Sequence, residues 1–111
     1  MTRDQVLARV RETRPGEYSD ERILAMISEC DQRIYREILD GYVVPEAGAE
    51  LIAPEPYDEL YIWWALAHIA LMQQDVGAYN NAMQLFNALW DEYGRMVSRK
   101  YRREKPSVYR I

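Results

Sequence analysis

The apolar stretch at residues 60–72, LYIWWALAHIALM, constrains the fold more than any other part of the sequence. Apolar and aromatic side chains fill nearly every position, so a helix over these residues would be apolar almost all the way round. Such a helix is stable only when other elements surround it on several sides. The stretch is shorter than the roughly 20 apolar residues that cross a bilayer. We therefore expect a buried central helix, either of the fold or of an assembly.

Capping residues divide the preceding part of the chain into two helices. Thr2 and Gln5 have the spacing of a capping box, which predicts a short first helix over about residues 3–13. The sequence RPGEY then ends this helix, and Ser19 is placed to cap a second helix that ends before Gly41. The second helix carries one apolar stripe, Ile23, Ile27, Cys30, Ile34 and Ile38, and leaves Glu29, Arg33, Arg36 and Glu37 for water.

Prolines and glycines mark the remaining boundaries. Residues 41–56 contain three prolines and two glycines, which argues against a helix, although YVV and LIA could pair as a short hairpin. Pro56 suits the first turn of a third helix, and Gly77 separates that helix from a fourth over about residues 78–104. We expect one all-α domain, residues 1–111, built as a small four-helix bundle. Its long C-terminal helix would pack antiparallel to the third, and its end would project.

Charge is distributed unevenly along the chain. Residues 95–111, a basic C-terminal extension, hold seven Lys or Arg and one Glu, a net charge of +6, whereas residues 1–94 carry −10. This asymmetry favours an oriented contact with nucleic acid, an acidic partner or the acidic part of a second copy. The simpler alternative is a solvated helix end whose cations interact with the helix dipole. The cations expected to contact a partner or DNA are Arg95, Arg99, Lys100, Arg102, Arg103 and Lys105.

Amide side chains form a second pattern on the fourth helix. Asn80, Gln84, Asn87 and Asp91 recur at steps of four, three and four residues, so they share one face. This face is either solvated, which is the default, or an amide ladder that fixes the register of a neighbouring helix or subunit. Nine Tyr and three Trp against one Phe also favour association. The expected subunit-interface residues are Asn80, Gln84, Asn87, Trp90, Tyr93 and Tyr101.

No arrangement of residues indicates catalysis. His68, the only histidine, lies among apolar neighbours at helical spacing, which favours a packed side chain over a base or ligand. Cys30, the only cysteine, has the position of a small buried hydrophobe, and a lone thiol fits a reducing compartment. Glycine-rich phosphate loops and zinc spacings do not occur. We expect no enzyme, no metal and no cofactor; an enzyme using Asp91, Glu92 and His68 is the least favoured alternative.

The order of these elements resembles the small helical head-tail connector proteins, also called adaptor or head-completion proteins, of tailed bacteriophages and prophages. The likeness covers most of the chain and lies in YSDERILAMISECDQRIYREIL as the second helix and YNNAMQLFNALWDEYGRMV near the C-terminus. The matching residues of the latter segment are Tyr79, Asn80, Asn81, Phe86, Asn87 and Tyr93, with Arg or Lys following. The Trp-rich third helix and the proline-rich loop depart from the family pattern.

The resemblance implies a structural protein of the virion neck, assembled in the bacterial host cytoplasm without a membrane partner. About a dozen copies would form a ring between the portal protein and a tail-side neck protein, for head completion and DNA passage. The basic end would contact the portal, a neighbouring copy or, non-specifically, double-stranded DNA. The alternative from another class is a small helical DNA-binding regulator that uses the basic end, although a pI near 5.0 is atypical of such proteins.

Overall fold

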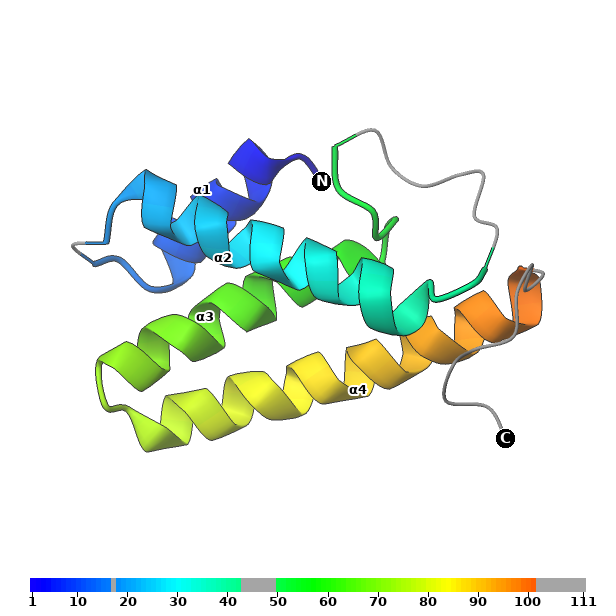
Figure 1. The fold of residues 1–111 in the computed structure, drawn as a ribbon. Coiled ribbons are helices and arrows are strands. Elements are labelled where there is room, and N and C mark those ends of the chain that lie inside the picture. Colours follow the sequence, from blue (N-terminus) through cyan, green and yellow to red (C-terminus); the bar gives the residue numbers. More distant parts are fainter. Residues whose placement is uncertain (17, 43–49, 102–111) are drawn as a thin grey trace.

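The computed structural model describes residues 1–16, 18–42 and 50–101, and the regular elements within them are helical (Figure 1). They are α1 (Arg3–Thr13), α2 (Asp20–Arg33), the π-helical turn η1 (Ile34–Ile38), the 3₁₀ turn η2 (Tyr57–Glu59), α3 (Leu60–Met72) and α4 (Val76–Lys100). Helix α3 contacts each of the other α-helices, and α4 runs antiparallel to it across a short turn. The all-α, four-helix fold is confirmed, with α3 at its centre.

The first two helices begin at the capping residues that the sequence indicates. The Thr2 hydroxyl accepts a hydrogen bond from the Gln5 backbone N–H at 3.1 Å, and the Gln5 side chain accepts one from the Thr2 N–H at 2.8 Å. At the start of α2 the Ser19 hydroxyl accepts from the Arg22 N–H at 3.2 Å. These bonds satisfy backbone donors that have no partner inside the helix. The predicted capping box and the predicted Ser19 cap are both confirmed.

The hydrophobic core lies between α3 and the inner faces of the other helices. The stripe predicted on the second helix is buried along its whole length, through α2 and into η1. Cys30 belongs to this stripe, and its burial raises the pKa of the thiol, so Cys30 is the small buried hydrophobe that its position predicts. Helices α1 and α4 complete the core with Val6, Val10, Ala82, Phe86, Tyr93 and Val97.

A buried polar network fixes residues 50–53 against α2 and α3. The Tyr61 hydroxyl donates to Asp31 Oδ1 at 2.6 Å and accepts from the Ala53 N–H at 2.9 Å. The Ile52 N–H donates to the same Asp31 oxygen at 3.0 Å. Burial, and then the bond to Asp31, raise the pKa of Tyr61, which therefore stays protonated as a donor. Asp31 thus connects α2 to the chain segment that enters α3.

The turn between α3 and α4 differs from the one expected. Gly77 does not break the helix; it lies inside the first turn of α4, which begins at Val76. The chain reverses at Gln74, whose φ of 58° lies in the left-handed region, and the Asp75 carboxylate accepts from the Ala78 N–H at 3.1 Å. Asp75 therefore determines the start of α4, because its carboxylate accepts from the Ala78 N–H, whereas glycine has no side chain to accept such a bond.

Two other boundaries also need correction. Helix α4 ends at Lys100 rather than near residue 104, because Tyr101 adopts an extended backbone with φ −111° and ψ 152°. Pro56 precedes the 3₁₀ turn η2 instead of occupying the first turn of α3. The hairpin considered for YVV and LIA falls partly on residues 43–49, which lie outside the described residues. Among the helices that the structure describes, none combines the length and apolarity needed to cross a membrane.

Candidate interaction surface

Helix α4 has an inner face that belongs to the core and an outer face that does not. Ala82, Phe86, Tyr93 and Val97 recur at steps of four, seven and four residues, and all are buried against the rest of the bundle. The outer face is exposed over most of the helix. The candidate residues for partner contacts divide between these two faces.

The outer face of α4 carries no charge over its first three fifths. From Val76 to Trp90 the sequence contains no Asp, Glu, Lys, Arg or His, although Asn80, Gln84 and Asn87 are all exposed there. The side chain of Leu85 is also 42% exposed on this helix. Solvent-facing positions of surface helices usually carry charged residues, whereas the buried centres of protein interfaces are depleted of them. This uncharged outer face, residues 76–90 of α4, is therefore the candidate contact surface for another chain.

Tyr93 does not belong to this surface, and its assignment to a subunit interface is wrong. The residue is only 1% exposed, and its ring stacks on Tyr57 of η2 with centroids 5.0 Å apart and planes 17° from parallel. Burial raises the pKa of its hydroxyl, which therefore stays neutral. Tyr93 lies seven residues from Phe86 and four from Val97, so helical geometry places it on the inner face.

Trp90 and Tyr101 occupy intermediate positions. Both are partly buried and pack against the core, so each offers only part of its surface to a partner. The Trp90 ring lies 5.3 Å from that of Phe86. The Lys100 ammonium nitrogen lies 5.4 Å from the centroid of the Tyr101 ring. Of the six expected interface residues, the structure brings Asn80, Gln84 and Asn87 together on the outer face of α4.

The last described turn of α4 still packs against the bundle. Val97 is fully buried, and Met96 packs against the core beside it. Arg95, Arg99 and Lys100 are exposed around them. Within the described ranges no carboxylate forms an ion pair with Arg95 or Arg99. The other expected contact residues, Arg102, Arg103 and Lys105, lie outside the described residues.

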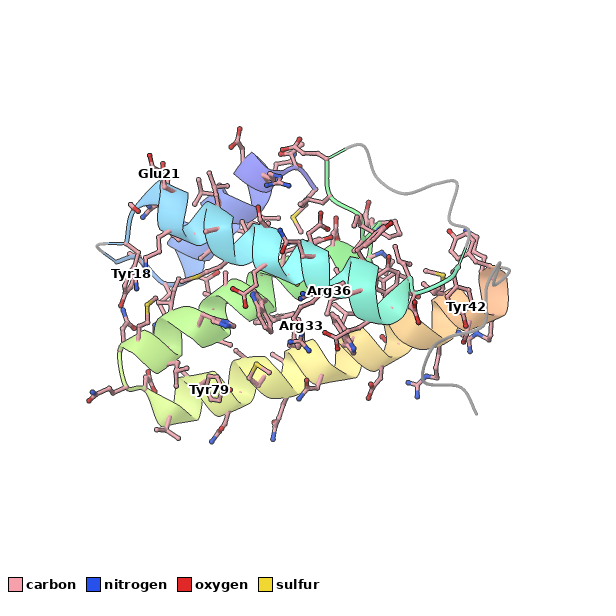
Figure 2. The ribbon with its side chains drawn as sticks, in the orientation of Figure 1. Tyr18, Glu21, Arg33, Arg36, Tyr42 and Tyr79 are labelled. Atoms are coloured by element: carbon pink, nitrogen blue, oxygen red, sulfur yellow. The ribbon has the colours of Figure 1, made fainter. Side chains whose placement is uncertain are left out.

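Sequence reasoning missed a cluster of aromatic rings that holds Arg33. Instead of facing water alone, the Arg33 guanidinium lies 5.0 Å from the ring centroid of Trp64 and 5.2 Å from that of Trp90, between α3 and α4 (Figure 2). Two tryptophans about 26 residues apart in sequence contact one cation, and only the tertiary fold brings them together. The Trp64 ring also contacts Phe86 and His68, at centroid distances of 5.2 and 4.3 Å.

The cation is held in place by Glu37, one turn further along. Arg33 Nε lies 2.8 Å from Glu37 Oε2, and this hydrogen bond raises the pKa of Arg33 and lowers the pKa of Glu37. A lowered carboxyl pKa stabilises the fold at neutral pH, and that contribution is lost as the pH falls through the lowered pKa. Because both side chains are partly exposed, the pair contributes no more than about 0.5 kcal/mol.

His68 is packed on its own helix. The side chain is partly buried, its ring lies against Trp64, and Nδ1 lies 2.8 Å from the Trp64 carbonyl oxygen one turn earlier. Among the described residues, no three His, Cys, Asp or Glu side chains gather in the way that metal ligands do. His68 is therefore a packed imidazole within the bundle.

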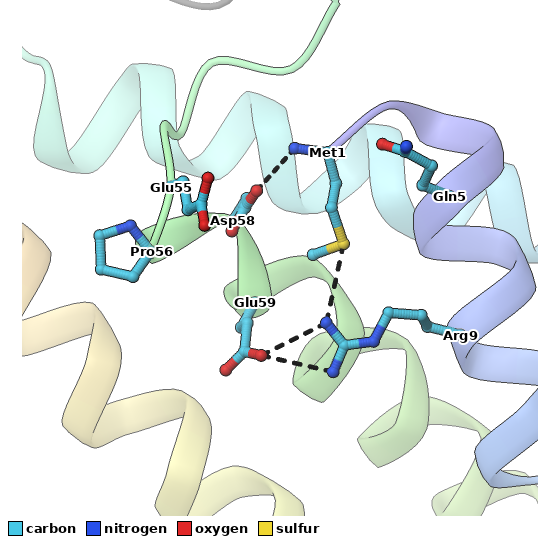
Figure 3. Close-up of a pocket in the computed structure, with 7 residues that line it drawn as sticks. All are labelled: Met1, Gln5, Arg9, Glu55, Pro56, Asp58 and Glu59. Carbon is cyan, nitrogen blue, oxygen red and sulfur yellow. Dashed lines mark hydrogen bonds and ion pairs between the residues drawn. The ribbon is translucent and has the colours of Figure 1, made fainter.

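A separate pocket of about 350 Å³ lies where the N-terminus meets η2 (Figure 3). The buried Asp58 carboxylate contacts the Met1 amino group at 2.6 Å, and Arg9 contacts Glu59 at 3.3 Å. Its other lining residues are Gln5, Glu55 and Pro56. Asp58 and Glu59 therefore already have cationic partners within the chain. These two ion pairs connect the N-terminus and α1 to η2, which leads into α3.

No protein-family model, curated protein sequence or solved structure matches this chain at a significant level. The chemistry of the surface therefore has to indicate the function. Its two unusual features are the uncharged outer face and the exposed cations that follow it on the same helix.

Proposed function

We propose that the protein is a structural subunit of a phage or prophage neck, which forms a ring between the portal and the tail-side proteins. The observation that carries the proposal is the uncharged outer face of α4, followed directly by the exposed cations Arg95, Arg99 and Lys100. A face without charge suits contact with another protein, and a basic end beside it gives that contact a direction. Both features fit a passive building block for head completion and DNA passage.

Amide groups make the uncharged face suitable for a protein partner. Asn and Gln side chains both donate and accept hydrogen bonds, so a facing helix can satisfy them without a buried charge. Exposed apolar side chains also lie around the turn between α3 and α4, where Asp75 forms an ion pair with Arg14. They are Leu71, Met72 and Val76. Contact with another chain would remove this apolar area from water, which favours association.

The basic end gives the proposed subunit a second kind of contact. In a closed ring each copy binds its neighbours through two different faces, so all copies point the same way. The cations of α4 then lie at equivalent places around the ring. There they would meet acidic groups of the portal or of an adjoining copy, or phosphates of DNA that passes through the channel.

Deletion of the gene from the phage or prophage that encodes the chain tests this function. We expect DNA-filled heads without tails, counted by electron microscopy, because the neck cannot be completed. Wild-type protein supplied in trans should restore tailed particles, whereas Asn87→Arg should lower their number at least about tenfold, since it buries a charge in the contact. Gln32→Arg, the same kind of change at an exposed position of α2, is the matched control. Tailed, infectious particles from the deletion strain would rule the function out.

The exposed cations on α4 also favour a second function, that of a small helical DNA-binding regulator. A regulator binds one DNA sequence tightly, with an affinity that falls steeply with salt, whereas a connector binds DNA weakly and without sequence preference. Fluorescence anisotropy with several duplexes at about 50 and 200 mM salt separates the two. Sequence-specific binding that disappears in Arg95→Glu and Arg99→Glu would favour the regulator.

A further inference from the structure

Gly94 occupies a position in α4 where no contact among the described residues requires glycine. It lies well inside the helix, and a Cβ atom built on it would meet no atom within 4 Å. Glycine is less favourable than alanine in a helix interior, because it loses more conformational freedom on folding. The missing side chain therefore leaves open space on the surface at a cost in helix stability. Close approach of another molecule to the backbone is one structural reason for a glycine outside turns and caps.

The open space at Gly94 belongs to a groove of about 370 Å³ between η1 and α4. One wall is the π-helical turn, an irregularity that is rare in helices and frequent at functional sites. The groove is lined from this side by Glu37, Ile38 and Tyr42, and from α4 by Trp90, Asp91, Gly94, Arg95 and Ser98. The π-helical turn η1 and Gly94, a glycine inside a regular helix, thus meet at one groove.

Two charges on the α4 side of this groove lack partners. Asp91 and Arg95 are exposed and stand one helical turn apart, in the order that favours an ion pair within a helix. Yet in residues 1–16, 18–42 and 50–101 neither side chain forms an ion pair. Glu37, the third charged residue of the groove, is already paired with Arg33. The groove therefore presents one free carboxylate and one free guanidinium, side by side along α4.

We propose that a second copy of the chain binds in this groove, with the two α4 helices antiparallel and Asp91 of each copy opposite Arg95 of the other. Antiparallel pairing about a two-fold axis near residue 93 matches each free charge with its opposite, twice. Gly94 then lies beside the crossing point, where the lack of a side chain lets the two backbones approach closely. The same surface meets itself without like charges in contact, so the groove is self-complementary.

This two-fold contact goes beyond the ring of the proposed function. Neighbours in a closed ring meet through two different faces, whereas here both copies use the same one. The pairing therefore belongs to the free protein or to two facing assemblies. If the two-fold pairing does not occur, the proposed function still stands, because head completion tests that function separately.

Sedimentation equilibrium of the whole chain over a range of concentrations tests the pairing. The wild type should be a dimer at high concentration, and Asp91→Arg or Arg95→Asp should each weaken the dimer at least about tenfold, because each sets two like-charge pairs at the contact. The double variant, Asp91→Arg with Arg95→Asp, should dimerise again, because it restores two opposite-charge pairs. Glu29→Arg, an acid-to-base change on the exposed side of α2, is the control and should dimerise like the wild type.

Gly94→Leu separates lost pairing from lost folding. Leucine is the better helix former and meets open space, so the melting temperature of the monomer should rise while the dimer disappears. A wild type that stays monomeric up to millimolar concentration would overturn the proposal. A double charge variant that dissociates as readily as the single variants would also overturn it. Exchanging the two charges restores both ion pairs whenever Asp91 of one copy faces Arg95 of the other.

Discussion

Tyr93→Ala should destabilise the protein by about 3–5 kcal/mol, the usual range for removing a large aromatic side chain from a core. Tyr93 is among the largest fully buried side chains, and its ring stacks on Tyr57. The substitution removes this contact between α4 and η2 and leaves a cavity that the surrounding helices cannot fill. Urea unfolding followed by circular dichroism measures the loss as a lower midpoint with an unchanged slope.

Asn87→Ala is the matched control, because Asn87 lies on the outer face of the same helix. An exposed substitution away from caps and packing changes the free energy of unfolding by no more than about 0.5 kcal/mol. Alanine is also the better helix former, so the change should be neutral or slightly stabilising. If Tyr93→Ala and Asn87→Ala had the same unfolding midpoint, Tyr93 would have to lie on the surface. The inner and outer faces of α4 would then be assigned wrongly.

The second large effect is expected for Asp31→Ala, at about 2–4 kcal/mol. This substitution takes away the acceptor of both the Tyr61 hydroxyl and the Ile52 N–H. A buried donor left without an acceptor costs about 1–3 kcal/mol, and Tyr61 is fully buried. The segment at residues 50–53 would also lose its connection to α2, so the entry into α3 should loosen.

Hydrogen exchange shows where the effect of Asp31→Ala arises. The amides of Ile52 and Ala53 should exchange faster in the variant, beyond what the fall in global stability explains. Asp31→Asn keeps a carbonyl acceptor at the same place, so it should lose less stability than the alanine variant. Gln32→Ala, at the exposed neighbouring position, should change the free energy of unfolding by no more than about 0.5 kcal/mol. An Asp31→Ala protein as stable as Gln32→Ala would mean that the network does not hold residues 50–53.

Much of the fold could be predicted because its signals are local. The capping box at Thr2, the cap at Ser19 and the apolar stripe of the second helix each depend on spacings of three or four residues. The central position of α3 follows from its being apolar on all sides. The amide stripe at Asn80, Gln84 and Asn87 lies outside, because α4 has only one inner face and the larger side chains occupy it.

The rest could not be predicted because it depends on contacts between distant residues. The sequence places Arg33 beside the apolar stripe of the second helix and predicts that it is solvated. In the structure its guanidinium lies against tryptophans of α3 and α4. Helical spacing puts Tyr93 on the same face as Phe86 and Val97, but its stacking on Tyr57 joins residues 36 positions apart and is seen only in the fold. The turn at Gln74 and Asp75 was not predicted, because Gly77 lies close by and glycine is the more common sign of a helix end.

The central claim is that the outer face of α4 and its basic end bind other neck proteins, and a direct measurement is sedimentation velocity with the portal protein of the same genome. Wild-type protein should sediment with the portal ring at about a dozen copies per ring, and Gln32→Arg should do the same. The Asn87→Arg variant should sediment apart from the portal ring, as unbound protein, while its circular dichroism spectrum remains helical. Wild-type protein that sediments apart from the portal at every concentration tested, or an Asn87→Arg variant that binds the portal as well as the wild type, would contradict the claim.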